Sequence, residues 1–117
     1  MPSLNFTVFI DKVESGEKRQ TIRLHRKRPI KVGDTLYLFT GMRTKGCRRL
    51  TVQIAPDWRG DRVRCTDTCT RRWADLRDDE AIARADGFAS ANEFRAWFER
   101  MHSPAPDTLF DVIRWEP

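Results

Sequence analysis

The sequence predicts one α+β domain, a mixed β-barrel of about five to six short strands with two or three helices beside it. Residues 4–66 consist largely of short apolar or alternating runs separated by Gly, Pro and Asp, which is typical of strands and turns. Helical spacing then replaces this pattern, and one more apolar run follows. A strand that comes after the helices can pair with the earlier sheet and close it. Because 117 residues suit a single core, residues 1–117 are expected to form one domain.

The expected strands are short segments in which apolar side chains alternate with polar ones or follow one another. One helical turn, residues 11–15, separates the first two strands, and Gly16 is a suitable terminator for it. Residues 67–77 show no clear period and stay without an assignment. The strands are expected at residues 4–10, 19–24, 35–39, 47–54, 62–66 and 109–115.

Two helices are expected in the second half, because each begins with a capping pattern. Asp78 is the candidate N-cap of the first, since acidic side chains follow it in the first turn, and Gly87 is its candidate end. Ser90 and Glu93 form the Ser-x-x-Glu capping box of the second, which is expected at residues 91–102. Its apolar stripe, expected to pack in the core, consists of Phe94, Trp97, Phe98 and Met101.

Charge is distributed unevenly along the chain. The net charge is +5, but residues 1–72 carry 17 basic and 7 acidic side chains, a net of +10, whereas residues 73–117 carry 5 basic and 10 acidic ones, a net of −5. A basic surface attracts phosphates through long-range steering and counterion release, so RNA or a nucleotide is a candidate partner. Two alternatives stay open: a solvated surface with no partner, and a protein-interaction face on the acidic helical half.

Composition excludes several classes of protein. Apolar residues make up 39% of the chain, which is enough for a core, so we expect a folded domain rather than a disordered one. No apolar run approaches the ~20 residues of a membrane-spanning helix, and the first residues lack the basic stretch and apolar core of a secretory signal. We therefore expect a cytoplasmic protein with no membrane partner.

The three cysteines, Cys47, Cys65 and Cys69, are expected to be free thiols, because their number is odd and the protein is expected to be cytoplasmic. Cys65 and Cys69 have a Cys-x3-Cys spacing. Zinc, however, needs four ordered ligands or three and a water, and no second pair of cysteines follows. We expect no metal and no cofactor.

The segment from Gly16 to Arg23 is the most informative part of the sequence. In the strand expected at residues 19–24, Thr21 and Arg23 share a face because side chains alternate with period two. Gly16-x-Lys18-x-x-Thr21-x-Arg23 resembles the ASCH signature Gly-x-Lys-x-x-(Glu or Thr)-x-Arg. The resemblance continues in order through Val32-Gly33-Asp34 before a strand, the segment Ala85-Asp86-Gly87-Phe88-Ala89-Ser90 and the final strand.

The resemblance to the ASCH family implies a PUA-like β-barrel with helices beside a ligand cleft, and recognition of RNA or a nucleoside there. The chain further resembles the small bacterial N4-acetylcytidine amidohydrolases, in which a Lys and a Thr match Lys18 and Thr21. Their later Glu falls on Asp86 after a one-residue shift, so the acid here is one methylene shorter. Other ASCH proteins are ribonucleases or coactivator modules, so the resemblance does not imply a single activity.

Two functions follow as hypotheses, and the first is preferred. A binding module would hold RNA or a modified nucleoside or nucleotide in a cleft lined by Lys18, Thr21, Arg23 and Asp86. An amidohydrolase acting on N4-acetylcytidine-type nucleosides would use Thr21 as the nucleophile, Lys18 as the base and protonated Asp86 as the acid. A ribonuclease is less favoured.

Further ligand-binding candidates are basic or aromatic residues, which contact phosphates and stack on bases in single-stranded RNA, together with the motif glycine. These candidates are Gly16, Arg23, Arg26, Arg28, Arg43, Trp58 and Trp73. The natural ligand and the oligomeric state stay open.

Overall fold

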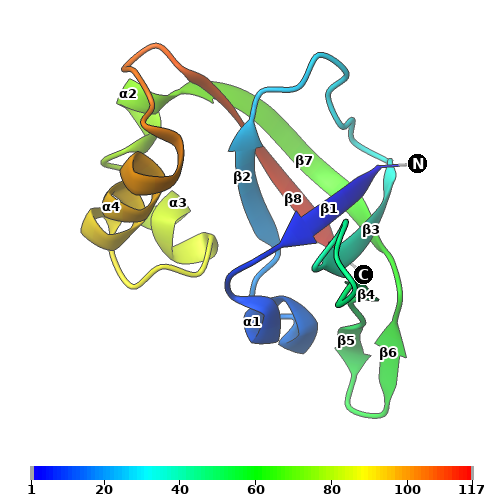
Figure 1. Cartoon of the computed structure of the whole chain (residues 1–117). Helices are drawn as coiled ribbons and strands as arrows, with labels where there is room; N and C mark the ends of the chain where they lie inside the picture. Colours follow the sequence, from blue (N-terminus) through cyan, green and yellow to red (C-terminus); the bar gives the residue numbers. More distant parts are fainter. Residues whose placement is uncertain (1, 117) are drawn as a thin grey trace.

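The computed structural model describes residues 2–116 and confirms the α+β class (Figure 1). Helices α2, α3 and α4 gather on one side of the sheet, whereas the β5–β6 hairpin projects away from them. The strands are β1 (Ser3–Phe6), β2 (Gln20–Leu24), β3 (Thr35–Thr40), β4 (Arg48–Arg49), β5 (Val52–Ala55), β6 (Trp58–Gly60), β7 (Val63–Arg72) and β8 (Leu109–Glu116). The helices are α1 (Ile10–Ser15), α2 (Trp73–Leu76), α3 (Glu80–Ala85) and α4 (Ala91–His102).

The main sheet has six strands, in the order β1-β3-β7-β8-β2 with β4 paired to β3, and it is mixed because β1 is parallel to β3. The last strand, β8, pairs with β7 on one side and β2 on the other, so the prediction that it returns to the earlier sheet is confirmed. The sheet order contains no backbone ladder between β1 and β2 within residues 2–116. A side chain bridges the two instead: Arg23 Nη2 donates to the carbonyl oxygen of Asn5 at 2.6 Å.

Two apolar cores lie on opposite faces of β8. Ile113 and Trp115 belong to the first core, with residues of β1, β3 and β5. Phe110 and Val112 belong to the second core, which the helices cover. Both faces of the strand are therefore buried, and this explains why its sequence is a nearly continuous apolar run rather than an alternating one.

Helix α4 forms at the residues predicted for it. The Ser90 hydroxyl oxygen accepts a hydrogen bond from the backbone N–H of Glu93 at 3.2 Å, as expected of the N-cap in a capping box. One residue of the predicted core stripe is misplaced, because Met101 is 56% exposed. The longest helix, α4, has 12 residues, and no helix within residues 2–116 has the length and apolar character needed to cross a bilayer.

The N-cap predicted for the preceding helix is wrong by one residue. Asp79, not Asp78, accepts a hydrogen bond from the backbone N–H of Ile82, at 3.0 Å. Asp78 is exposed and forms an ion pair with Arg95 on α4 instead. Asp78 therefore joins α3 to α4, while its neighbour caps α3.

Three strand predictions need correction. The segment 4–10 divides, because Phe9 adopts a left-handed conformation (φ 58°) just before α1. The segment 47–54 divides between β4 and β5, and β5 forms a two-stranded hairpin with β6. The segment 62–66 is the start of the ten-residue β7, which pairing with β8 extends through residues that lack an alternating pattern.

Candidate functional site

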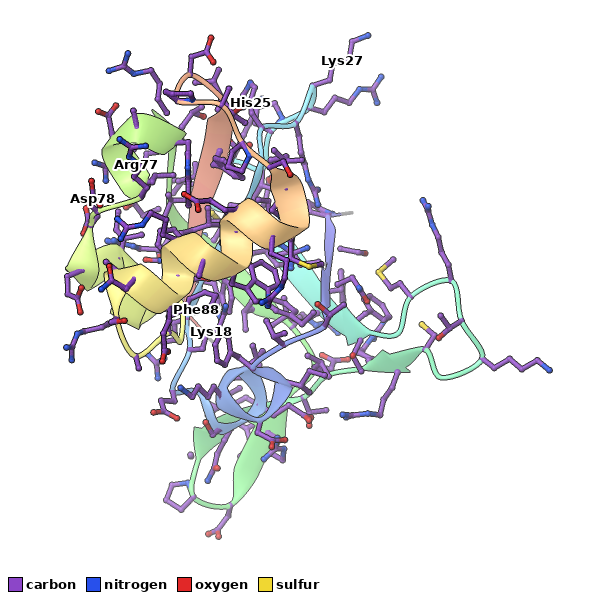
Figure 2. All side chains as sticks on the ribbon, turned by 60° about the vertical axis from the view of Figure 1, so that its left-hand side comes forward. Lys18, His25, Lys27, Arg77, Asp78 and Phe88 are labelled. Carbon is purple, nitrogen blue, oxygen red and sulfur yellow. The ribbon has the colours of Figure 1, made fainter. Side chains whose placement is uncertain are left out.

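A cavity of about 270 Å³ opens between β1 and β2, beneath α4. Figure 2 shows Lys18 and Phe88, two of its lining residues, below the α4 helix. The polar residues that line the cavity include Asn5, Lys18, Thr21, Arg23 and Asp86. The aromatic residues that line it are Phe6, Phe88, Trp97 and Phe98. Its mouth is marked by three exposed residues, Leu24, Met101 and His102.

Lys18 and Asp86 form a buried pair in this cavity. The Lys18 ammonium donates to the backbone carbonyl oxygen of Asp86 at 2.6 Å and lies 3.4 Å from Asp86 Oδ2, and each residue is only 4% exposed. Burial lowers the pKa of Lys18 and raises the pKa of Asp86, while the attraction between the two opposes both shifts. The second carboxylate oxygen, Oδ1, is buried, and no donor within residues 2–116 reaches it with hydrogen-bond geometry, although the Gln20 side chain lies near enough to oppose the rise in the Asp86 pKa. Such an atom is costly to leave unsatisfied, so it is a candidate acceptor for a ligand.

The chain reaches this geometry through two glycine turns. Gly16 ends α1 with φ +83°, and the backbone N–H of Lys18 then bonds to Lys12 O at 2.9 Å, which fixes the start of β2. Gly87 follows Asp86 with φ +110°, a conformation that favours glycine. A Cβ there would lie 2.9 Å from Phe9 Cδ2, so this turn also requires the close approach of a ring.

Thr21 and Arg23 line the cavity from β2, as do their neighbours Ile22 and Leu24. Arg23 Nε donates to the Thr21 hydroxyl oxygen at 3.1 Å, and its guanidinium carbon lies 4.9 Å from the ring centre of Phe6. Burial, with a smaller contribution from the nearby charge of Arg26, lowers the pKa of Arg23 to about 10. Arg23 therefore stays a cation at neutral pH, and the Thr21 hydroxyl keeps its own proton to donate.

The aromatic wall comes from the turn after α3 and from α4. Phe88 packs at 5.9 Å from Trp97 and 6.4 Å from Phe98, between ring centres, and Phe9 supports it from behind at 4.9 Å. Charged and hydroxyl groups on one side thus face rings on the other. An apolar pocket with a few convergent polar groups is the usual form of a small-molecule site.

Two solved structures resemble this chain throughout. One is protein EF3133 from Enterococcus faecalis V583, of the DUF984 family, with a TM-score of 0.64 at 17% identity over 99% of this chain and 79% of that one. The other is an ASCH domain from Lactobacillus crispatus JV V101, with a TM-score of 0.61 at 13% identity over 98% of this chain and 79% of that one. The chain has an ASCH-like fold. No protein-family model matches it, and none of the curated proteins does.

Within this ASCH-like fold, the structure brings Lys18, Thr21, Arg23 and Asp86 together, although Asp86 lies 68 residues from Lys18 in the chain. Gly16 does not line the cavity. Its role is in the turn, where a Cβ would lie 3.1 Å from Gln53 O.

The outer ligand-binding candidates are scattered. Arg26 is half-buried just beyond β2, whereas Arg28 and Arg43 are exposed in separate loops. Trp58 is 62% exposed in the β5–β6 hairpin, away from the cavity. Trp73 is a correction: it is 2% exposed and packs against Phe94, Phe98 and Phe110, so it cannot stack on a ligand without unpacking the core.

No metal site is found among the described residues, where no three or more His, Cys, Asp or Glu side chains group around one point. The three cysteines are free; Cys65 is buried, and Cys47 and Cys69 are exposed.

Several lining residues escaped the sequence prediction, chief among them Phe88, Trp97 and His102. The α4 apolar stripe identified the buried face of the helix, but periodicity cannot distinguish a side chain that fills a core from one that lines a cavity. Asn5, at the other wall, carries no sequence signal of its own.

Proposed function

We propose that this ASCH-like domain binds a nucleobase-bearing ligand, a nucleoside or a single nucleotide of RNA, in the cavity between β1 and β2. The observation that carries the proposal is the buried Lys18–Asp86 pair with its unused Oδ1, in a cavity that the Phe88 and Trp97 rings also line. A nucleobase has matching features, because it is planar, stacks on aromatic side chains and carries hydrogen-bond donors and acceptors along its edge.

The size of the cavity favours one unit over a strand. Drug-sized ligands occupy pockets of roughly 300–1,000 Å³, and this cavity is at the lower end, at about 270 Å³. A single base with its sugar at the mouth suits that space.

The polar groups suit the edge of a base. Asp86 Oδ1 would accept a hydrogen bond from an amino or ring N–H group. Lys18 uses one proton on the Asp86 carbonyl and has further protons for a ring nitrogen or carbonyl acceptor. A ligand that offers both a donor and an acceptor would relieve the unsatisfied atom as it binds, and hydrogen bonds to charged groups contribute about 1.5–3 kcal/mol each.

The test is a calorimetric or NMR titration of the purified protein with the four ribonucleosides. We expect saturable binding of at least one nucleoside. Asp86→Asn should weaken this binding at least tenfold, because an amide replaces one of the two acceptor oxygens of the carboxylate by an NH2 donor. Asp57→Asn, at an exposed carboxylate in the hairpin turn, is the matched control and should bind normally. Thr21→Val checks the same site with a variant that keeps the buried pair. Absence of binding by all four nucleosides and by their oligonucleotides would overturn the proposal.

A second candidate function is hydrolysis of an acylated amino group, as in N4-acetylcytidine. It is favoured by the presence of a hydroxyl, an amine and a carboxyl group in one cavity, on Thr21, Lys18 and Asp86. Thr21 Oγ would attack the acyl carbon while Lys18, as a neutral amine, takes the hydroxyl proton. Protonated Asp86 would then give a proton to the leaving amine, and water would release the acyl group from Thr21.

The burial that lowers the Lys18 pKa and raises the Asp86 pKa acts in the direction that this reaction needs. Incubation with N4-acetylcytidine should release cytidine and acetate, and Thr21→Val should abolish the release. Turnover that persists in Thr21→Val would exclude Thr21 as the nucleophile, and no turnover by the parent protein would leave binding alone.

A further inference from the structure

The polar wall of the cavity continues past its mouth along β2. Thr21, Arg23 and His25 occupy alternate positions and so point to the same face, with each step of two residues spanning about 6.6 Å. Thr21 and Arg23 line the cavity. Figure 2 shows His25 at the start of the next loop, whose Lys27 points out into solvent.

His25 is held in one orientation by the buried carboxylate of Asp111. Its Nδ1 lies 2.8 Å from Asp111 Oδ1, and the Asp111 side chain is 4% exposed against 40% for His25. The same carboxylate accepts hydrogen bonds from the Thr70 hydroxyl at 2.6 Å and from the backbone N–H of Arg26 at 3.3 Å. Burial works against the charge of Asp111, but these donors outweigh it and hold its pKa below the usual value. Because an ionised carboxylate only accepts, the Nδ1–H group of His25 donates to Asp111. When the ring is doubly protonated, Nε2–H is a second donor, and a phosphate oxygen can accept it.

The loop that begins at His25 keeps its positive charges unpaired. Within residues 2–116, none of its other basic side chains (Arg26, Lys27, Arg28 and Lys31) lies within 4.0 Å of a carboxylate. Some basic side chains elsewhere have such partners, among them Arg48 with Glu14 and Arg49 and Arg62 with Asp61, whereas Arg43 and Lys45 have none within residues 2–116. What distinguishes the loop at residues 25–31 is that its unpaired cations directly follow an oriented imidazole at the end of β2. Unpaired cations attract anions, and Lys and Arg contacts to phosphate oxygens are the usual result.

We propose that residues 25–31 form a phosphate site that continues the cavity, so that the natural ligand is a phosphorylated nucleoside rather than a free one. His25 Nε2, presented by Asp111, and the basic side chains of the loop contact the phosphate while the base enters the cavity. This inference rests on the proposed function. The phosphate is either a terminal monoester or a diester of an RNA backbone, since both present the same oxygens.

The experiment compares each ribonucleoside with its 3′- and 5′-monophosphates, with dinucleoside monophosphates that carry only a diester, and with inorganic phosphate. We expect a monophosphate or a dinucleoside to bind about tenfold more tightly than the nucleoside, as a charge-assisted contact allows. His25→Gln, which can still donate to Asp111, and Lys27→Gln should each remove most of that gain. Lys45→Gln, an exposed lysine in the loop between β3 and β4, is the matched control and should remove none.

Equal affinity for nucleosides and their phosphates would overturn the phosphate site and leave the proposed function intact. If Lys45→Gln removed as much of the phosphate-dependent increase in affinity as Lys27→Gln does, the phosphate site would also be overturned, because the increase would then depend only on net charge. Binding of inorganic phosphate that depends on His25 and Lys27, with no preference among bases, would support the phosphate site and refute the base-binding cavity. Preferential binding of a monophosphate would identify a terminal monoester as the source of the phosphate, and preferential binding of a dinucleoside monophosphate would identify an RNA backbone diester.

Discussion

Replacement of Lys18 by methionine should destabilise the fold strongly, although methionine nearly matches lysine in volume. At 3.4 Å and an effective dielectric constant of about 20, the attraction between unit charges on Lys18 and Asp86 is about 5 kcal/mol. Removal of one partner of a buried ion pair costs about 3–5 kcal/mol, because the remaining charge is left without compensation. Lys18→Met should therefore lower the free energy of unfolding by about that amount.

The loss should depend on pH in a direction that the structure sets. Burial already raises the Asp86 pKa above its ordinary value of 3.8, and without Lys18 that pKa rises further. The native state of the variant then binds the Asp86 proton more tightly than the unfolded chain does. The contribution of Asp86 to the stability of the variant is consequently greatest near and below pH 4 and is lost as pH rises through the folded-state pKa. The deficit relative to the parent protein should be smaller at pH 5 than at pH 8.

Chemical denaturation at the two pH values measures these quantities, and a double-mutant cycle isolates the pair. Lys18→Met combined with Asp86→Leu replaces both charges by apolar groups and should recover most of the stability that either single change loses. Lys45→Met, at an exposed lysine, should change stability by less than about 0.5 kcal/mol. A loss under about 1 kcal/mol at pH 8, or a double variant that loses the sum of the two single losses, would refute the coupling of the two charges.

Three further predictions concern stability and can be checked by thermal or chemical unfolding. Ser90→Ala should cost about 1 kcal/mol, since it removes the cap on Glu93, whereas Asp78→Ala should cost clearly less than Asp79→Ala because Asp78 caps nothing. Trp73→Ala should cost about 3–5 kcal/mol and Trp58→Ala less than about 0.5 kcal/mol, and similar losses at the two sites would contradict the burial of one and the exposure of the other. Gly87→Ala should destabilise by more than about 1 kcal/mol, because φ is +110° and its Cβ would meet the Phe9 ring; a neutral effect would contradict that turn.

Elements with local signals were predictable from the sequence, and α4 shows why. Its cap, apolar stripe and stop all lie within about one turn of the residues they control, so residues 91–102 could be located without any tertiary information. The N-cap of α3 could not, because Asp78 and Asp79 have the same capping preference. The choice depends on Arg95, which approaches Asp78 from another helix.

Strand β7 was underestimated for a similar reason. Beyond Cys65 its side chains are mostly exposed, so no alternation of apolar residues marks it. Only pairing with β8, from Arg64–Glu116 to Arg72–Leu109, keeps it extended. An Arg-rich segment without a clear period made Trp73 a stacking candidate, yet the chain turns into α2 at that residue and buries the ring against Phe98.

The site itself was half predictable. Strand periodicity placed Thr21 and Arg23 on one face, and resemblance to the ASCH signature singled out Lys18. Asp86 had no periodic signal, because it lies between the end of α3 and a glycine turn, and only the resemblance to the amidohydrolases singled it out. It reaches Lys18 only through the packing of the helices on the sheet, and no sequence period records a contact across 68 residues.

The shorter acid at position 86 also has a structural consequence that the alignment alone did not show. Lys18 contacts the backbone carbonyl of Asp86 at 2.6 Å and its carboxylate at 3.4 Å, so the two oxygens share one ammonium group. An aspartate keeps its carboxylate close to its own backbone, and the other carboxylate oxygen, Oδ1, has no hydrogen-bond partner within residues 2–116. Asp86→Glu would move the carboxylate outward by one methylene, into the cavity. If Oδ1 is a ligand acceptor, that change should weaken nucleoside binding while Lys18 keeps its bond to the backbone carbonyl. If the position serves as a catalytic acid, the change to the residue type that the similar amidohydrolases carry there should raise turnover of N4-acetylcytidine, so one substitution separates the two functions.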